Sequence, residues 1–169
     1  MIFNLNYMED NAMTKEEKAA RFQKLNQNIQ KGQILCAGSS LMEMFPVEKF
    51  IKEEYPGTII YNRGIGGYIT DELLEHLDVC VLDLQPSRLF INIGTNDLSN
   101  PDVTIDGLMK KYDEILCRIE EAIPGIEILM MFSTTASTNS GFIWSPTDHS
   151  GECWVERTIV SAATGLPST

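Results

Sequence analysis

The chain has 169 residues, of which 43% are hydrophobic and 22% are charged, and its formal net charge is −11. These values are typical of one globular domain with a buried core, and they argue against a disordered or fibrous protein. The negative charge disfavours nucleic acid and anionic membrane surfaces as partners, because both attract basic proteins.

The first predicted elements are a helix and a strand. Residues 14–31 are expected to be helical, because Thr14 and Glu17 have the spacing of a capping box and apolar residues recur on one face. Gly32 is expected to end this helix. The short apolar run at 33–37 suits a strand that is buried on both sides.

The same alternation continues along the chain. Periodicity and Pro-Gly breaks predict helices over 48–54, 71–77 and 108–123, and strands over 58–61, 88–93 and 126–131. Strands that alternate with helices predict a parallel sheet covered on both faces, a three-layer α/β fold. Ligands of such sheets bind at the carboxyl ends of the strands.

Three unusual segments directly follow predicted strands and should therefore share one edge of the sheet. They are Gly38-Ser39-Ser40, the NRGIGG sequence at 62–67 and the GTND sequence at 94–97. The first would place a serine hydroxyl at a helix N-terminus, where free N–H groups and the helix dipole favour negative charge. In the second, glycines allow a ligand to approach the backbone N–H groups closely. In the third, Asn96 supplies an amide donor suited to an oxyanion.

Each segment also has a purely structural interpretation. Serines commonly cap helices, glycine-rich loops are weak signals when taken alone, and Asn and Asp often bond their own backbone in turns. The order and spacing of the three segments carry more information than any one of them.

That order resembles the SGNH (GDSL-like) hydrolases. The phrases YNRGIGGYIT and FINIGTND are the most specific parts of the resemblance, which spans about 33–131. The nearest branch is similar to the catalytic subunits of platelet-activating-factor acetylhydrolase. The resemblance implies a single domain over 1–169 with the three-layer, flavodoxin-like sheet of SGNH hydrolases, and an atypical or incomplete part at 132–169.

The resemblance also implies roles for individual residues. Ser40 matches the nucleophile, with Ser39 standing where an Asp is common. Gly67 matches the glycine whose backbone N–H points at the oxyanion, and Asn96 matches the asparagine that donates its side-chain amide. Asp97 matches a position that supports the loop.

The fourth motif of the family is missing. The family's base is the histidine of a C-terminal D-x-x-H, and this chain contains no D-x-x-H. The late candidate is His149, whose neighbour Asp148 is poorly placed to orient its ring, since adjacent residues point in different directions. Glu152 could orient the ring if this stretch were helical. His76, in an acidic helix, is expected to be a solvated surface residue.

The composition changes after Met131. Residues 132–169 contain 14 Ser or Thr, no Lys and both Trp residues. Short strands are predicted at 142–144 and 154–160. Two interpretations of this part are open: a polar segment on the protein surface, or a tail unrelated to the family. Loss of the segment that normally completes one sheet edge would expose apolar surface and favour a homo-oligomer.

The N-terminus and the cysteines indicate a cytoplasmic protein. The first residues lack a basic start followed by an apolar stretch, so we predict no secretory leader, and no apolar run is long enough to span a bilayer. Cys36, Cys80, Cys117 and Cys153 lack metal-ligand spacing and are expected to be buried free thiols. Neither a metal nor a cofactor is predicted.

The sequence therefore predicts a serine esterase that cleaves short-acyl esters of a small molecule, with Ser40, Gly67, Asn96 and, as base, His149. Two alternatives belong to other classes. One is a catalytically impaired SGNH scaffold that binds without turnover, and the other is a flavodoxin-like binder of phosphate or nucleotide. Because D-x-x-H is absent, we expect weak activity or none.

Overall fold

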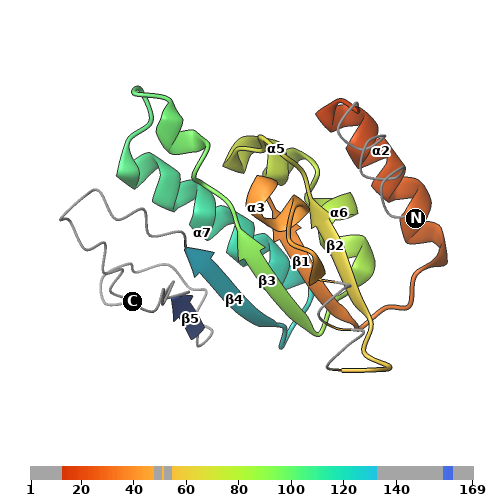
Figure 1. Ribbon diagram of the computed structural model, residues 1–169. Coiled ribbons are helices and arrows are strands. Elements are labelled where there is room, and N and C mark those ends of the chain that lie inside the picture. The colour runs from red at the N-terminus through yellow and green to blue at the C-terminus, as the bar shows by residue number, and fades with distance from the viewer. Residues whose placement is uncertain (1–12, 48–50, 52–54, 133–157, 162–169) are drawn as a thin grey trace, which may run out of the picture.

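Five parallel strands form the centre of the computed structural model, which describes residues 13–47, 51, 55–132 and 158–161 (Figure 1). The strands are β1 (Ile34–Gly38), β2 (Ile60–Gly64), β3 (Arg88–Asn92), β4 (Glu127–Phe132) and β5 (Thr158–Ser161). Their order in the sheet is β2-β1-β3-β4-β5. The prediction of a parallel α/β sheet is confirmed.

The described helices precede β1 or connect successive strands. The α-helices are α2 (Lys15–Leu25), α3 (Ser40–Glu43), α5 (Thr70–Glu75), α6 (Leu77–Cys80) and α7 (Ile105–Ala122). Short 3-10 turns are η1 (Asn26–Asn28), η2 (Leu82–Leu84) and η3 (Asp97–Ser99). The predicted helix over 48–54 lies almost wholly outside the described residues.

Alternate residues of the central strands face two different hydrophobic clusters, as the two-residue period of a strand requires. Leu35, Ala37, Leu89 and Ile91 belong to the larger cluster, which also takes side chains from α2, α5, α6 and α7. On the opposite face, Cys36 packs with the α3 residue Met42 and with Val47. Both faces of the sheet are therefore covered by helical segments.

Helix α7 has the apolar stripe that its sequence predicted. Leu108, Tyr112, Ile115, Leu116 and Ile119 recur at helical spacing and are all buried. Thr104 caps the helix by accepting a hydrogen bond from the backbone N–H of Gly107 at 3.1 Å. The helix begins three residues before the predicted start, at Ile105, whose side chain is exposed and lies outside the buried stripe.

The predicted helix over 14–31 is shorter than expected. Its capping box at Thr14 and Glu17 is present, but α2 ends at Leu25 and continues only as the turn η1. Asn26 donates from Nδ2 to the Val79 carbonyl at 2.8 Å and accepts from the buried Arg63 guanidinium at 2.9 Å. These tertiary contacts end the helix before Gly32, which lies in the following turn.

The C-terminal part contributes a strand to the sheet. Leu129 of β4 pairs with Thr158 of β5, and the parallel register continues to Phe132 and Ser161. The expectation that this edge would lack a strand is therefore wrong, and the predicted strand at 154–160 is present in its last part. The predicted strand at 142–144 lies outside the described residues.

The cysteines and the possibility of a membrane-spanning helix were also considered in the sequence. Cys36 and Cys80 are buried free thiols and Cys117 is a half-buried one, while Cys153 lies outside the described residues. Of the described helices, none combines the length and apolar character needed to cross a membrane.

Candidate active site

Three strands end at the same level on one edge of the sheet. Gly38, the last residue of β1, is paired with Gly64 of β2 and with Asn92 of β3. Gly38 and Gly64 lie within the first two segments singled out in the sequence, and the third segment begins at Gly94, two residues after Asn92. The prediction that they share one edge is confirmed.

Gly38 sets the position of the segment that carries Ser40. Its φ is +135°, and a Cβ placed on it would lie 1.9 Å from the Asn92 carbonyl oxygen. The next residue, Ser39, donates its backbone N–H to that same oxygen at 2.9 Å. Only glycine fits this approach, which turns the chain sharply from β1 into α3.

Ser40 is the first residue of α3 and is half-buried, whereas Ser39 is only 2% exposed. Among the described contacts, the Ser39 side chain makes no capping hydrogen bond, so the capping interpretation is not supported. Helix α3 has four residues. Because a helix dipole sums over aligned peptides, so short a helix offers its free N–H groups rather than a macrodipole.

The glycine turn after β2 lies against this helix. A Cβ placed on Gly64 would be 2.3 Å from the Glu43 backbone nitrogen, so β2 and α3 approach as closely as backbone allows. A Cβ placed on Gly66 would lie 4.0 Å from the Cβ of Ser40. Gly67 follows with a φ of +78°. The turn and Ser40 are therefore direct neighbours.

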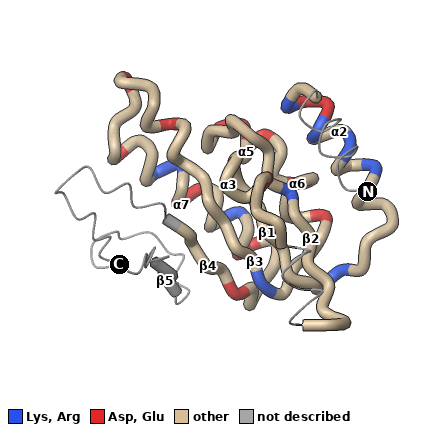
Figure 2. The backbone as a smooth tube through the Cα atoms, in the orientation of Figure 1, with Lys and Arg blue, Asp and Glu red and all other residues tan. Residues whose placement is uncertain are grey.

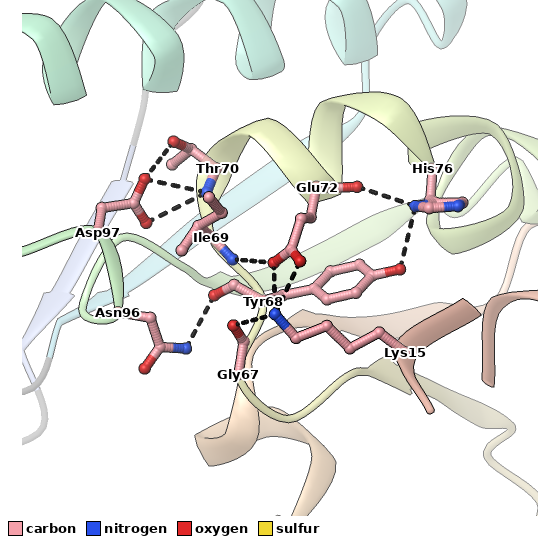
Figure 3. A network of polar contacts seen from close by, with 9 residues as sticks. All are labelled: Lys15, Gly67, Tyr68, Ile69, Thr70, Glu72, His76, Asn96 and Asp97. Carbon is pink, nitrogen blue, oxygen red and sulfur yellow. Dashed lines mark hydrogen bonds and ion pairs between the residues drawn. The ribbon is translucent and has the colours of Figure 1, made fainter. Parts of the chain in front are cut away.

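The segment after β3 holds the glycine turn from its other side (Figure 3). Asn96 donates from Nδ2 to the carbonyl oxygen of Tyr68 at 2.8 Å. An amide nitrogen has two hydrogens, and this contact uses one of them. Asp97 is buried and accepts from both the backbone N–H of Thr70 (3.1 Å) and its hydroxyl (2.5 Å). Asp97 thus supports the loop, as its position in the motif implied.

Several residues that the sequence did not single out complete this network. Lys15 donates from Nζ to the Gly67 carbonyl at 2.8 Å and forms an ion pair with Glu72 at 2.7 Å. Glu72 also accepts the backbone N–H of Ile69 at 2.9 Å. A carboxylate in the first turn of the predicted helix at 71–77 was a visible signal for this N-terminal contact. No local signal pointed to Lys15.

The expectation for His76 is wrong. Its ring is half-buried, and Nδ1 lies 3.1 Å from both the Tyr68 hydroxyl and the Glu72 carbonyl (Figure 3). Burial, together with nearby carboxylates, raises the pKa of Tyr68, so its hydroxyl stays protonated. His76 has this partner because Tyr68 folds under α5, a contact that the helical pattern alone does not reveal.

The predicted base and the two residues considered for orienting it belong to the C-terminal part of the chain. His149, Asp148 and Glu152 lie outside the described residues. Within 13–47, 51 and 55–132, no group of three or more His, Cys, Asp or Glu side chains could hold a metal ion.

Comparisons with known proteins identify one family. The family described as "GDSL-like Lipase/Acylhydrolase family" matches residues 46–162. A search of curated proteins finds no match.

Three solved structures illustrate the similarity of fold. A Streptococcus pneumoniae protein, named provisionally as a platelet activating factor, is 27% identical with a TM-score of 0.61, over 78% of this chain and 60% of that one. A GDSL-like lipase from Bacteroides thetaiotaomicron, also provisionally named, is 20% identical with a TM-score of 0.54, over 67% and 57%. An acetylxylan esterase mutant from Geobacillus stearothermophilus is 18% identical with a TM-score of 0.50, over 61% and 60%. The chain thus spans only about three fifths of the length of these relatives.

Proposed function

The chain belongs to the GDSL-like lipase/acylhydrolase family, and on this premise we propose that it is a serine esterase that cleaves short-acyl esters through an acyl-enzyme on Ser40. The family supports ester hydrolysis as the class of reaction. The short acyl group is proposed from the resemblance of the motifs to platelet-activating-factor acetylhydrolase. An acetylxylan esterase, by its name, acts on an acetyl ester with the same fold.

One observation carries this proposal: the half-buried Ser40 adjoins a glycine turn that Asn96 holds in place. A Cβ placed on Gly66 would lie 4.0 Å from the Ser40 Cβ, and Asn96 donates to the carbonyl of Tyr68, two residues after Gly66. A nucleophile beside preorganised N–H donors is the arrangement that acyl transfer requires.

In the proposed reaction, the Ser40 hydroxyl oxygen attacks the ester carbonyl while a base takes its proton. The backbone N–H groups of Ser40 and Gly67 and the second amide hydrogen of Asn96 hold the resulting oxyanion. The tetrahedral intermediate then expels the alcohol, which receives the proton back from the base. Water hydrolyses the acyl-Ser40 by the same steps and regenerates the serine.

The candidate for this base is His149, although we expect it to contribute little to the rate. The chain contains two histidines, and Nδ1 of His76 is already engaged by the Tyr68 hydroxyl and the Glu72 carbonyl. Without a D-x-x-H motif, nothing in the sequence of His149 specifies how its ring is oriented. We therefore expect slow turnover.

Reaction with a fluorophosphonate, which modifies an activated serine, tests the proposal. The intact mass should rise by one phosphonyl group in the wild-type chain and remain unchanged in Ser40→Ala. An unmodified wild-type chain would favour the impaired scaffold. If such a chain were also stabilised against heat by nucleotides, it would be a nucleotide binder instead.

A further inference from the structure

Two lysines of α2, one helical turn apart, contact the glycine turn and the helix α3 that begins at Ser40. Figure 2 shows basic residues gathered along this helix. Nζ of Lys15 lies 2.8 Å from the Gly67 carbonyl oxygen, in the glycine turn. Nζ of Lys18 lies 2.6 Å from Oε1 of Glu43, in the helix that starts at Ser40. The proposed reaction uses neither lysine.

The Lys15 contact fixes the peptide group that follows Gly67. Lys15 holds the oxygen of this peptide, and its N–H, which belongs to Tyr68, donates to the Ile65 carbonyl at 3.2 Å. The Gly67 N–H is joined to this peptide only through the φ and ψ of a glycine, which has an unusually wide conformational range. Holding the peptide at both ends therefore limits where the Gly67 N–H can point.

The Lys18 contact holds the serine helix against the same turn. Glu43 lies one helical turn after Ser40, and its Oε1 is paired with Lys18. Its other oxygen, Oε2, lies 2.5 Å from where a Cβ on Gly66 would be. The carboxylate thus lies between α2, α3 and the glycine turn, and a side chain at residue 66 would force it to move.

Because the Lys15 side chain is partly exposed to water, we expect it to affect the geometry of the glycine turn more than the stability of the fold. The side chains of Lys15 and Glu72 are 35% and 29% exposed, and ion pairs with this much contact with water contribute little to the free energy of unfolding. The hydrogen bond from Lys15 to the Gly67 carbonyl should therefore affect the geometry of the turn more than the free energy of unfolding.

We infer that α2 is a positioning element of the active site: Lys15 orients the Gly67 N–H, and Lys18 holds α3 at a fixed distance from it. The inference rests on the proposed function for its catalytic consequence. The ordering of the turn does not depend on that function. Lys15 and Lys18 are therefore positioning residues, with no contact to the reacting atoms.

Lys15→Met tests the inference, with Lys111→Met as the matched control. Lys111 of α7 pairs with Asp71 of α5, the helix that also provides Glu72, and neither member of this exposed pair belongs to the turn. Hydrogen exchange, followed by NMR, should become at least about tenfold faster at the Tyr68 amide, which is bonded to the Ile65 carbonyl, in Lys15→Met and stay unchanged in Lys111→Met. Lys15→Arg, which keeps a charged donor, should restore most of the protection.

Kinetics provide the second measurement. For p-nitrophenyl acetate, Lys15→Met should lower kcat by about tenfold or more, because small misplacements in an active site have effects of this size, with KM within about twofold. A fluorophosphonate should label Ser40 more slowly by a similar factor.

The outcomes distinguish the positioning role of α2 from the proposed esterase function. Unchanged exchange at the Tyr68 amide in Lys15→Met, or equal acceleration in Lys111→Met, would overturn the inference whether or not the chain is active. A wild-type chain that reacts with neither ester nor fluorophosphonate would defeat the proposed function, while exchange still decides the ordering of the turn. If Lys15→Met does not fold, Lys15→Gln, which keeps a donor without the charge, takes its place. Loss of folding in that variant too would assign Lys15 to stability and overturn the inference.

Discussion

The side-chain amide of Asn96 donates a hydrogen bond of 2.8 Å to the peptide carbonyl of Tyr68. Through this bond, the loop after β3 holds the loop after β2, so two of the three proposed oxyanion donors are linked. The bond therefore gives Asn96 a part in stability as well as in the proposed chemistry.

Asn96→Ala should lower kcat by about 10²–10³, the usual effect of losing one oxyanion donor. It should also lower the free energy of unfolding by about 1 kcal/mol, because the Tyr68 carbonyl loses its partner. Steady-state kinetics and urea unfolding measure the two effects. The control is Asn100→Ala, which removes only a local contact with the Asp102 N–H in an exposed loop. A loss of activity no larger than the loss of folded protein would contradict the catalytic role.

Labelling by a fluorophosphonate should distinguish Ser40 from Ser39. Ser39 is 2% exposed, whereas Ser40 begins α3 and adjoins Gly66. Modification should vanish in Ser40→Ala and persist in Ser39→Ala, as measured by intact mass. The reverse pattern would move the nucleophile by one residue and break the match to the family motif.

Gly38→Ala should destabilise the fold more than a glycine substitution usually does. The added Cβ would lie 1.9 Å from the Asn92 carbonyl oxygen, so the centre of the sheet must shift. We expect a loss of at least ~3 kcal/mol from the combined clash and strain. Gly125→Ala is the control: it also has a positive φ, of +83°, but no atom within 4 Å. It should cost only about 1 kcal/mol. Equal losses in urea unfolding would refute a steric requirement at Gly38.

Stability should fall in alkaline solution because of buried thiols. Burial raises the pKa of the Cys80 thiol to about 12 and that of Cys36 to about 11. An unfolded thiol titrates near about 8.5. Below that pH both states keep the proton and the stability is complete. As pH rises from there toward the folded pKa values, the unfolded state loses protons first and is favoured.

Urea midpoints measured from about pH 8 to 11 should therefore decline, and Cys80→Ala should reduce the slope. Tyr68 and Tyr112, whose pKa values burial also raises, contribute in the same direction to both proteins. The difference between the two slopes isolates the thiol. Parallel curves for the wild type and Cys80→Ala would contradict the prediction.

Much of the fold could be predicted because its signals are local. Apolar runs such as 33–37 marked the strands, helical spacing marked 108–123, and the parallel arrangement followed from their alternation. The shared edge for Ser40, Gly67 and Asn96 required only that parallel strands end on the same side. The structure adds the reason that residue 38 is a glycine, its approach to the Asn92 carbonyl.

The contacts around the glycine turn could not be predicted because they join distant parts of the chain. Lys15 and Gly67 are 52 positions apart, and α2 has an ordinary amphipathic sequence. His76 looked solvated for the same reason, since its partner Tyr68 approaches from the preceding loop. Residue patterns describe one element at a time, whereas these contacts depend on how elements pack.

The last prediction concerns the base. The chain lacks D-x-x-H, and its composition changes after Met131. Without a correctly oriented imidazole, turnover by a serine triad falls by about 10⁴, and the oxyanion hole and substrate binding supply the remaining rate. We therefore expect weak hydrolysis of short p-nitrophenyl esters, almost unaffected by His149→Ala. The pH dependence of kcat should then show no step near the pKa of a histidine, about 6.5.

Two comparisons make this prediction decisive. Ser40→Ala should abolish the weak rate, which ties that rate to the site rather than to an impurity. Replacing the tail with one that carries D-x-x-H and its helix should raise kcat toward that of ordinary esterases, because the oxyanion donors are already in place. Turnover at an ordinary rate in the unaltered chain, lost in His149→Ala, would instead show that His149 is an oriented base. In that case Glu152, three residues away, would be the first residue to replace in search of its partner.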